Sequence, residues 1–153
     1  MKKFELTSET KINIFGKKLF RIKALISFGN VEAGETGGWV EKEENVNQSG
    51  DAWVFGNAEV FGNAEVFDNA WVSDNAWVSG NADYATIHGF GTQFRTTTFF
   101  RCKDKQVKVS CGCFYGTIPE FREQVKNTRK GKIAEEYLMI ADLMEKHFAE
   151  EAK

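Results

Sequence analysis

The sequence is poor in the residues that metal sites and many catalytic sites require. Its 153 residues include only two histidines and three cysteines. A structural zinc site needs four ligands, usually with two residues between paired cysteines, whereas one residue separates Cys111 from Cys113. We therefore expect no metal site and no cofactor. Cys102 and Cys111 are instead expected to be reduced thiols that could face each other across a hairpin.

Long apolar runs are also missing. Met1-Lys2-Lys3 is followed by the polar segment 5–10, which does not fit a secretory signal. No stretch approaches the roughly 20 apolar residues that a membrane-spanning helix needs. An odd number of cysteines in a chain without an export signal indicates a reducing compartment. These absences predict a cytoplasmic protein with no membrane partner.

The small net charge of −2 hides a strong segregation of charge. Residues 1–30 sum to +5, residues 31–94 to −10, residues 95–132 to +7 and residues 133–153 to −4. Because so acidic a centre would repel a long polyanion, we do not expect binding to extended nucleic acid. The basic segment could hold a small anion, or its acidic neighbours could neutralise it in the fold.

What the sequence does have is a repeat with a period of six between Ala52 and Tyr84. Valine recurs at 54, 60, 66, 72 and 78, alanine at 52, 58, 64, 70, 76 and 82, and asparagine at 57, 63, 69, 75 and 81. Val and Ala are predicted to point inward. The Gly-Asn and Asp-Asn pairs are predicted to form corners, because these residues tolerate the left-handed backbone region. Each unit of such a repeat is stable only when stacked on its neighbours.

The unit Val54-Phe-Gly-Asn-Ala-Glu, with an aliphatic residue followed four positions later by a small one, resembles the hexapeptide-repeat family. Members of this family form a left-handed β-helix with three short strands per turn. The resemblance implies parallel pairing of residues about eighteen apart, with Trp53 beneath Trp71, Glu59 beneath Trp77 and Glu65 beneath Asp83 on the three faces.

Conventional elements are predicted on either side of the repeat. Residues 11–28 alternate as a hairpin in which Ile12, Ile14, Phe20 and Ile22 are half-buried. Residues 39–51 resemble a first, imperfect coil followed by a two-residue slip, and a last irregular coil is expected to reach about Phe94. Further predictions are a hairpin over 96–111, a helix from a Thr117–Glu120 capping box to Thr128, and an amphipathic helix over 133–150. We therefore expect a mainly β protein in one compact unit: an N-terminal β-hairpin (1–30), a short left-handed parallel β-helix (31–94) and a C-terminal ββαα unit (95–153).

Aromatic side chains flank the valines of the repeat. Phe55, Phe61, Trp71 and Trp77 should point outward, because successive side chains alternate across a strand. Exposed aromatic rows usually mark an interface. The terminal segments of the same chain or other subunits could cover these rows. Because proteins of the hexapeptide-repeat family commonly assemble as trimers, the resemblance implies a homo-oligomer and favours a trimer.

His88 is the sharpest candidate for catalysis. Acyltransferases of the hexapeptide-repeat family use a histidine near the β-helix as a general base between subunits. His88 falls in an alanine slot at the end of the repeat, although no carboxylate is close to it in sequence. The γ-class carbonic anhydrases share this β-helix but bind zinc through three histidines, one more than this chain has. We expect a non-enzymatic protein, and an acyltransferase that uses His88 is the alternative; a histidine that merely caps the last coil explains the same residue.

The basic hairpin beyond the repeat, together with the outward aromatics, has the parts of a nucleotide site. Cations can bind phosphate and rings can stack on a base. An ordinary solvated basic hairpin is the alternative explanation. The predicted ligand-binding residues are Trp71, Trp77, His88, Arg95, Arg101, Lys103, Lys105 and Lys108.

A second resemblance covers nearly the whole chain. The segments Gly37-Gly-Trp-Val-Glu, the Gly-Asn-Ala-x-Val repeats, Thr96-Thr-Thr-Phe-Phe and Cys111-Gly-Cys-Phe look like those of small uncharacterised bacteriophage and prophage proteins. The resemblance implies a phage-type accessory protein in the cytoplasm of a bacterial host. Our primary hypothesis is a homo-oligomer that binds or sequesters a small anionic ligand or a nucleotide, such as an immune signalling nucleotide, at subunit interfaces. A further alternative is a protein–protein inhibitor that uses the acidic prism as its contact surface.

Overall fold

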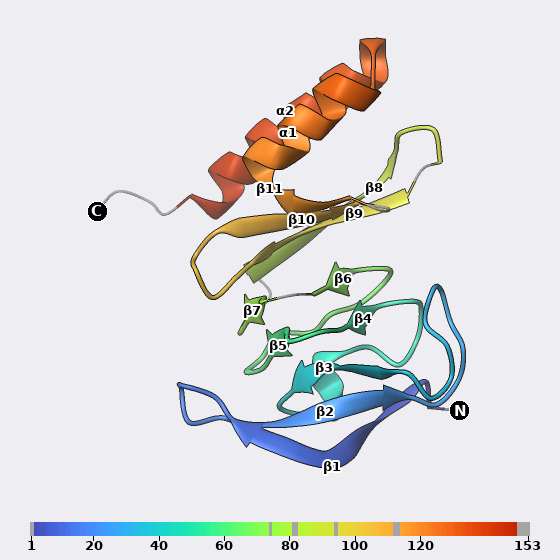
Figure 1. Ribbon diagram of the computed structural model, residues 1–153, viewed down its shortest axis with the longest axis vertical. Helices are drawn as coiled ribbons and strands as arrows, with labels where there is room; N and C mark the ends of the chain where they lie inside the picture. Colours follow the sequence, from blue (N-terminus) through green and yellow to red (C-terminus); the bar gives the residue numbers. More distant parts are fainter. Residues whose placement is uncertain (1, 74, 81–82, 94, 112–113, 150–153) are drawn as a thin grey trace.

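The structure is a computed structural model, and it describes residues 2–73, 75–80, 83–93, 95–111 and 114–149. The molecule is layered along its long axis (Figure 1). Helices α1 (Ile118–Thr128) and α2 (Gly131–Phe148) cover one face of a four-stranded sheet, the hexad repeats lie beneath that sheet, and the N-terminal hairpin lies at the opposite end. The strands are β1 (Phe4–Ile12), β2 (Lys18–Ala24), β3 (Thr36–Val40), β4 (Trp53–Val54), β5 (Glu59–Val60), β6 (Trp71–Val72), β7 (Trp77–Val78), β8 (Tyr84–Phe90), β9 (Arg95–Arg101), β10 (Val107–Cys111) and β11 (Phe114–Thr117), and a short 3-10 helix spans Glu43–Asn45.

The predicted fold class is wrong. The fold is mixed, with about 40% strand and 23% helix, and its strands form three separate sheets instead of a single parallel β-helix. One sheet has the order β1-β2-β3-β5-β7, the second is the antiparallel sheet β11-β10-β9-β8, and the third is the pair β4-β6. The physical reason is that β2 pairs antiparallel with β3 while β5 pairs parallel with it, so the N-terminal hairpin extends one face of the repeats into a mixed sheet.

The predicted pairing is nevertheless confirmed on two of the three faces of the repeat; on the third, where Glu65 is predicted beneath Asp83, Tyr84 pairs antiparallel with Phe100 instead. Trp53 pairs in parallel with Trp71, and Glu59 pairs in parallel with Trp77. The predicted two-residue slip is also present, because Val40 pairs with Val60 and Val46 bridges Val66, twenty positions apart in each case. The inward valines at 54, 60, 66, 72 and 78 and the inward alanines at 52, 58, 64, 70 and 76 are at most 2% exposed, while Ala82 lies outside the described residues.

Three corners of the repeat turn at the residue before asparagine. Gly56 (φ 65°), Gly62 (φ 63°) and Asp68 (φ 58°) occupy the left-handed backbone region. This region is open to glycine and tolerated by aspartate, and a glycine here avoids the clash of a Cβ with the following carbonyl. Gly62 also lies so close to the next coil that an added Cβ would be 2.6 Å from the carbonyl oxygen of Ser79. The regular spacing of the corners therefore comes from backbone geometry as well as from the inward residues.

The N-terminal hairpin is present but longer than predicted. Strands β1 and β2 pair antiparallel from Phe4–Ala24 to Ile12–Lys18. Ile12 and Ile14 are 64% and 77% exposed, so the prediction that they are half-buried is wrong. Lys11 and Asn13, which alternate with them, contact Glu59 of the repeat, so Ile12 and Ile14 point to the opposite, open side. Phe4 is the residue of β1 that enters the core.

The N-terminal segment also covers part of the aromatic surface of the repeat. The ring of Trp53 contacts Phe4 and Phe28 at centroid distances of 6.0 and 5.2 Å. Phe15, at the hairpin tip, contacts Phe61 and Trp77 at 5.7 and 5.0 Å. The N-terminal segment of the same chain therefore covers Trp53, Phe61 and part of Trp77.

Residues 84–90 do not form the predicted last coil. They form β8, whose partner is the antiparallel strand β9, with Tyr84 opposite Phe100 and His88 opposite Thr96. Beyond them, the predicted hairpin is confirmed as β9 and β10, whereas the sequence does not predict β11. Alternation along β9 sends Phe99 toward the helices and Phe100 toward the repeats, so the sheet joins two cores.

The two C-terminal helices match their sequence signals closely. The Thr117 hydroxyl accepts a hydrogen bond from the Glu120 N–H, and the Glu120 carboxylate accepts one from the Thr117 N–H at 2.9 Å. This is the predicted capping box. Helix α2 buries Tyr137, Ile140 and Ala141, followed by Met144 and Phe148, on the sheet. No helix in the described part of the chain is both long and apolar enough to cross a membrane.

Candidate functional site

The predicted ligand-binding residues do not form one site. Arg101 and Lys105 line a cavity of about 480 Å³ between the β9–β10 turn and the helices. Trp71 and His88 line a separate cavity of about 330 Å³. Trp77 and Lys103 lie instead around the buried carboxylate of Glu59. Lys108 lies over the ring of Tyr115 with 5.3 Å between the ammonium and the ring centroid, and the side chain of Arg95 is outside the described part of the structure.

Trp77 and Lys103 have structural roles in this arrangement. The Glu59 carboxylate, which is only 4% exposed, lies 2.9 Å from the Lys11 ammonium and 3.3 Å from the Lys103 ammonium. The Lys103 ammonium is 5.7 Å from the centroid of the Trp77 ring. A buried carboxylate is tolerated only when cations and hydrogen bonds compensate it. We therefore assign Lys103 to this ion cluster and not to a ligand site.

Arg101 connects three parts of the chain. Its Nε lies 3.3 Å from the Asp83 carboxylate, and its Nη2 donates a hydrogen bond of 3.0 Å to the carbonyl oxygen of Phe148. The guanidinium also stacks near the Phe148 ring, 5.2 Å from the centroid. A cation at the last turn of α2 interacts favourably with the free carbonyl groups there. These contacts occupy several of the hydrogen-bond donors of the guanidinium. Arg101 is therefore better described as part of the wall of the larger cavity than as a free receptor for an anion.

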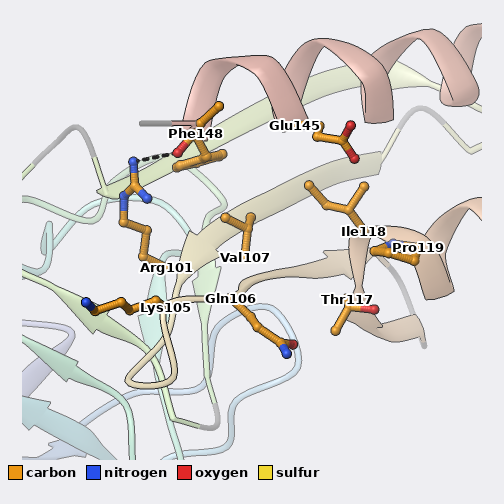
Figure 2. Close-up of a pocket in the computed structure, with 10 residues that line it drawn as sticks. Arg101, Lys105, Gln106, Val107, Thr117, Ile118, Pro119, Glu145 and Phe148 are labelled. Carbon is orange, nitrogen blue, oxygen red and sulfur yellow. Dashed lines mark hydrogen bonds between the residues drawn. The ribbon is translucent and has the colours of Figure 1, made fainter. Parts of the chain in front are cut away.

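Figure 2 shows the larger cavity, which has apolar walls and a polar rim. Val107 of β10, Ile118 and Pro119 at the start of α1, and Phe148 of α2 supply the apolar surface. Gln106 and Thr117 supply polar atoms at its lower edge, and Glu145 lies on α2 above it. The charge of Glu145 is compensated by Arg122, whose Nη1 is 2.8 Å from the carboxylate.

Among the residues that the structure describes, Lys105 is the charged residue of this cavity without an oppositely charged neighbour. Among the described residues, no ion pair or hydrogen bond engages its ammonium. The Lys103-Asp104-Lys105 turn is closed by the Lys105 N–H donating to the carbonyl of Cys102 (2.9 Å) and the Gln106 N–H donating to the Asp104 carboxylate (3.0 Å). Figure 2 shows the Lys105 side chain at the rim, with its ammonium directed away from Ile118 and Pro119. A lysine stem is flexible, so rotation about its bonds can bring the ammonium over the opening.

The backbone of Lys105 is itself unusual. Its φ of 68° lies in the left-handed region, where a side chain with a Cβ costs about 1–2 kcal/mol and glycine is the usual choice. Asp68 is the other non-glycine residue with positive φ among the described residues. Aspartate tolerates this region better than most residues, whereas lysine has no short polar side chain to support it. A lysine at a strained position on the rim of the cavity of about 480 Å³ points to a use for its side chain.

The smaller cavity lies where the repeats meet the four-stranded sheet. Trp71 comes from β6 and His88 from β8, and Thr96, Thr98 and Ser110 come from β9 and β10. The His88 Nδ1 lies 3.1 Å from the Thr96 hydroxyl, so the residue that orients the imidazole is a threonine and not a carboxylate. A general base of the acyltransferase type is usually oriented by a third group, which here is uncharged.

The cysteines do not face each other as expected. Cys102 is buried in the core of the repeats, beside Ala76, whereas Cys111 pairs with Thr97 across β9 and β10. The Cys111 sulfur accepts a hydrogen bond from the Thr97 hydroxyl at 3.1 Å. Cys113 is not among the described residues. Within the described part of the chain, no group of three or more His, Cys, Asp and Glu side chains has the geometry to hold a metal ion.

Several residues at these places are not indicated by the sequence. The sequence places Phe148 only in the apolar stripe of the last helix, and Gln106 and Thr117 only in a strand and a helix cap. Glu59 flanks Val60, so the alternation that turns the aromatic residues outward applies to it as well, but it is 3% exposed because the N-terminal hairpin and Lys103 cover it. Asp83 accepts hydrogen bonds from the N–H groups of Ser79 and Gly80 and pairs with Arg101. Its place at the end of the repeat is the sequence signal that could have singled it out.

The sequence matches no protein-family model, and no curated protein matches it significantly.

Proposed function

We propose that the chain is a non-enzymatic binding protein for a small ligand that joins an anionic group to a flat or apolar body, of which a nucleotide is one example. The observation that carries the proposal is the cavity of about 480 Å³ with apolar walls and the uncompensated Lys105 on its rim. Ligand sites are typically concave, largely apolar and about 300–1,000 Å³ in volume, with a few polar groups that fix orientation.

The division of the walls suggests how such a ligand would lie. Its flat or apolar part would contact Val107, Ile118 and Pro119, and its anionic group would lie at the rim toward Lys105. The amide of Gln106 and the hydroxyl of Thr117 could donate further hydrogen bonds to the ligand. Arg101 would add positive potential while it stays bound to Asp83 and Phe148.

The test is a thermal-shift and calorimetric screen of the full chain. The panel contains linear and cyclic nucleotides, the corresponding uncharged nucleosides, and inorganic phosphate. A ligand that binds only the folded chain stabilises it by about 2.7 kcal/mol at one hundred times its Kd, so a tight ligand must raise the Tm. We expect a nucleotide to raise the Tm more than either its nucleoside or phosphate alone, because both walls of the cavity are then used.

A pair of lysine variants locates the ligand. Lys105→Gln removes the charge at the rim and should weaken binding about tenfold or more, because a charge-assisted contact contributes about 1.5–3 kcal/mol. Lys108→Gln removes a lysine that lies over Tyr115 outside the cavity and should leave the affinity unchanged. No Tm shift anywhere in the panel would contradict the proposal, as would equal affinities for the wild-type chain and Lys105→Gln.

The remaining functional expectations stay predictions. The predicted trimer, and the sequestration of a signalling nucleotide at subunit interfaces in a phage-type accessory role, both require an oligomer, which light scattering would detect. The acyltransferase alternative requires acetyl-CoA turnover that is lost in His88→Ala. The inhibitor alternative requires a protein partner for the acidic segment 31–94.

A further inference from the structure

The smaller cavity, of about 330 Å³, has walls of a different chemistry from the larger one. Three hydroxyl groups, from Thr96, Thr98 and Ser110, line it together with the imidazole of His88 and the ring of Trp71. Their order follows from the sheet register: His88 is opposite Thr96 and Thr98 is opposite Ser110. Directly opposed residues share a face, so these four side chains form one polar strip across β8, β9 and β10.

The alternation along β9 makes this strip a distinct surface. Phe99 faces the helices with Val109, while Thr98 faces the repeats and is 1% exposed. The Thr98 hydroxyl accepts a hydrogen bond of 3.1 Å from the Trp71 N–H. This bond ties the four-stranded sheet to the repeat and fixes the Trp71 backbone at the edge of the cavity.

The Trp71 ring supplies an apolar wall opposite the hydroxyl groups. It is half-buried and is held by the Phe55 ring in an edge-on contact, with 4.9 Å between centroids. A ring held in this way offers a rigid flat surface at little entropic cost when a ligand binds.

The charges around the cavity do not favour an anion. Among the described residues that line it, there is no lysine or arginine, and the one carboxylate is that of Asp51. His88 is the one lining group in that set able to carry a positive charge, and its Nδ1 already contacts Thr96. The remaining polar groups are the amides of Asn30 and Asn69, which both donate and accept hydrogen bonds.

We propose that this cavity binds an uncharged, hydroxyl-rich ring, either a free sugar or the sugar of a nucleoside. Sugar hydroxyls donate and accept hydrogen bonds at once, as the threonine, serine and asparagine groups here require. The Asp51 carboxylate accepts from such hydroxyls, and the C–H face of the sugar ring can lie against Trp71. The site is separate from the anion cavity, so its occupancy does not depend on the function proposed above.

Isothermal titration of the full chain with two sets of probes tests the inference. The first set contains methyl β-D-glucopyranoside, methyl β-D-galactopyranoside and methyl β-D-ribofuranoside, and the second contains adenosine and uridine. Binding of a glycoside identifies a free sugar as the ligand, whereas binding of the nucleosides alone identifies a base-linked sugar. We expect at least one probe to bind with a Kd of about 1 mM or lower.

Two variants that should not disturb the fold link binding to the polar strip. His88→Ala and Ser110→Ala each remove one exposed or half-buried hydrogen-bonding side chain and should weaken binding about five- to tenfold. Phe67→Ala removes an aromatic side chain of the repeat that is 44% exposed and does not line the cavity, and it should bind as the wild type does. Circular dichroism confirms that each variant is folded before its affinity is compared.

The inference fails if no probe binds at concentrations up to about 10 mM. It also fails if His88→Ala and Ser110→Ala bind as tightly as Phe67→Ala. Adenosine 5′-monophosphate is the charged probe. If this nucleotide bound more tightly than adenosine, and if His88→Ala abolished that advantage, the cavity would select an anion and the assignment would be overturned. Unchanged binding of adenosine in Lys105→Gln supports it, because that lysine belongs to the other cavity.

Discussion

The carboxylate of Glu59 lies 3.3 Å from the ammonium of Lys103 and thereby joins the repeat to the turn between β9 and β10. Lys11 of β1 approaches the same carboxylate at 2.9 Å, and Asn13 donates a longer hydrogen bond to it at 3.4 Å. One buried carboxylate thus connects the N-terminal hairpin, the repeat and the C-terminal sheet, which are far apart in the sequence.

Glu59→Gln should destabilise the chain by about 1–2 kcal/mol. Breaking a fully buried ion pair costs about 3–5 kcal/mol, but both lysines here are about one-third exposed and can turn to water. Urea unfolding measures the loss. Glu65→Gln is the matched control, because Glu65 occupies the same position in the next hexad but is exposed, and it should change stability by less than about 0.5 kcal/mol. Equal losses in the two variants would show that the Glu59 cluster contributes nothing specific.

The buried ammonium group of Lys3 should make the free energy of unfolding rise with pH between about pH 8 and 10.5. The side chain is 1% exposed and donates hydrogen bonds to the carbonyls of Ala52 (2.7 Å) and Gly50 (3.3 Å). Burial lowers the pKa of Lys3 from 10.5 to about 8, against the opposing effect of Asp51. Between these two pH values the unfolded chain binds more protons at this residue than the folded chain does. The free energy of unfolding therefore rises with pH in this window, by at most about 1.4 kcal/mol per pH unit.

The comparison that isolates Lys3 is between the wild type and Lys3→Met, by urea unfolding at several pH values. The difference in stability should be constant below pH 8 and should shift in favour of the wild type as the pH rises toward 10.5. Burial raises the pKa of Tyr84 to about 12, so the folded chain keeps that proton longer and both proteins lose stability above pH 10. This loss cancels in the difference. A difference that is flat or falls with pH would contradict the assignment to Lys3.

The local structure could be predicted where one residue type decides it. The hexad period indicates the eighteen-residue pairing because Val and Ala alone fit the interior, and the Thr117–Glu120 spacing indicates a helix start through two specific hydrogen bonds. The overall fold could not be predicted in this way. The pairing of β2 with β3, and of β8 with β9, depends on contacts between distant segments. The alternation of apolar and polar residues in each of these strands is compatible with several partner strands, so it does not identify the partner.

The candidate sites show the same limit. Trp71 and His88 stand out in the sequence because one flanks the repeat and the other breaks it, and they line one cavity. The basic residues form a group only because they are close in sequence, and alternation along β9 and β10 and the turn between them sends Arg101, Lys103 and Lys108 in three directions. Phe148 joins Arg101 from 47 positions away, which no local pattern could indicate.

Gly37 should be intolerant of even a methyl group. A Cβ at this position would lie 2.6 Å from Cζ2 of Trp53 and 2.7 Å from Cγ1 of Ile22, both in the core. Overpacking of this kind typically costs about 1–3 kcal/mol, so Gly37→Ala should lower stability by an amount in the upper part of that range. Gly80→Ala is the control, because a Cβ at Gly80 would have no heavy atom within 4 Å and neither glycine needs a positive φ. Similar unfolding midpoints for the two variants would contradict close packing at Gly37.

Lys105→Gly should stabilise the fold while it weakens the binding of an anion. Glycine relieves the left-handed strain at φ 68°, and the gain should be about 0.5–1 kcal/mol after the larger entropy of the unfolded glycine is subtracted. Asp68→Gly is the matched control: it relieves the same kind of strain at φ 58°, gains less because aspartate tolerates this region, and leaves the larger cavity intact. Urea unfolding and nucleotide titration of the two variants separate the effects. If the Lys105→Gly chain were less stable than the wild type, or if it bound the anion as tightly as the wild type does, the strain at this turn would have no connection with binding.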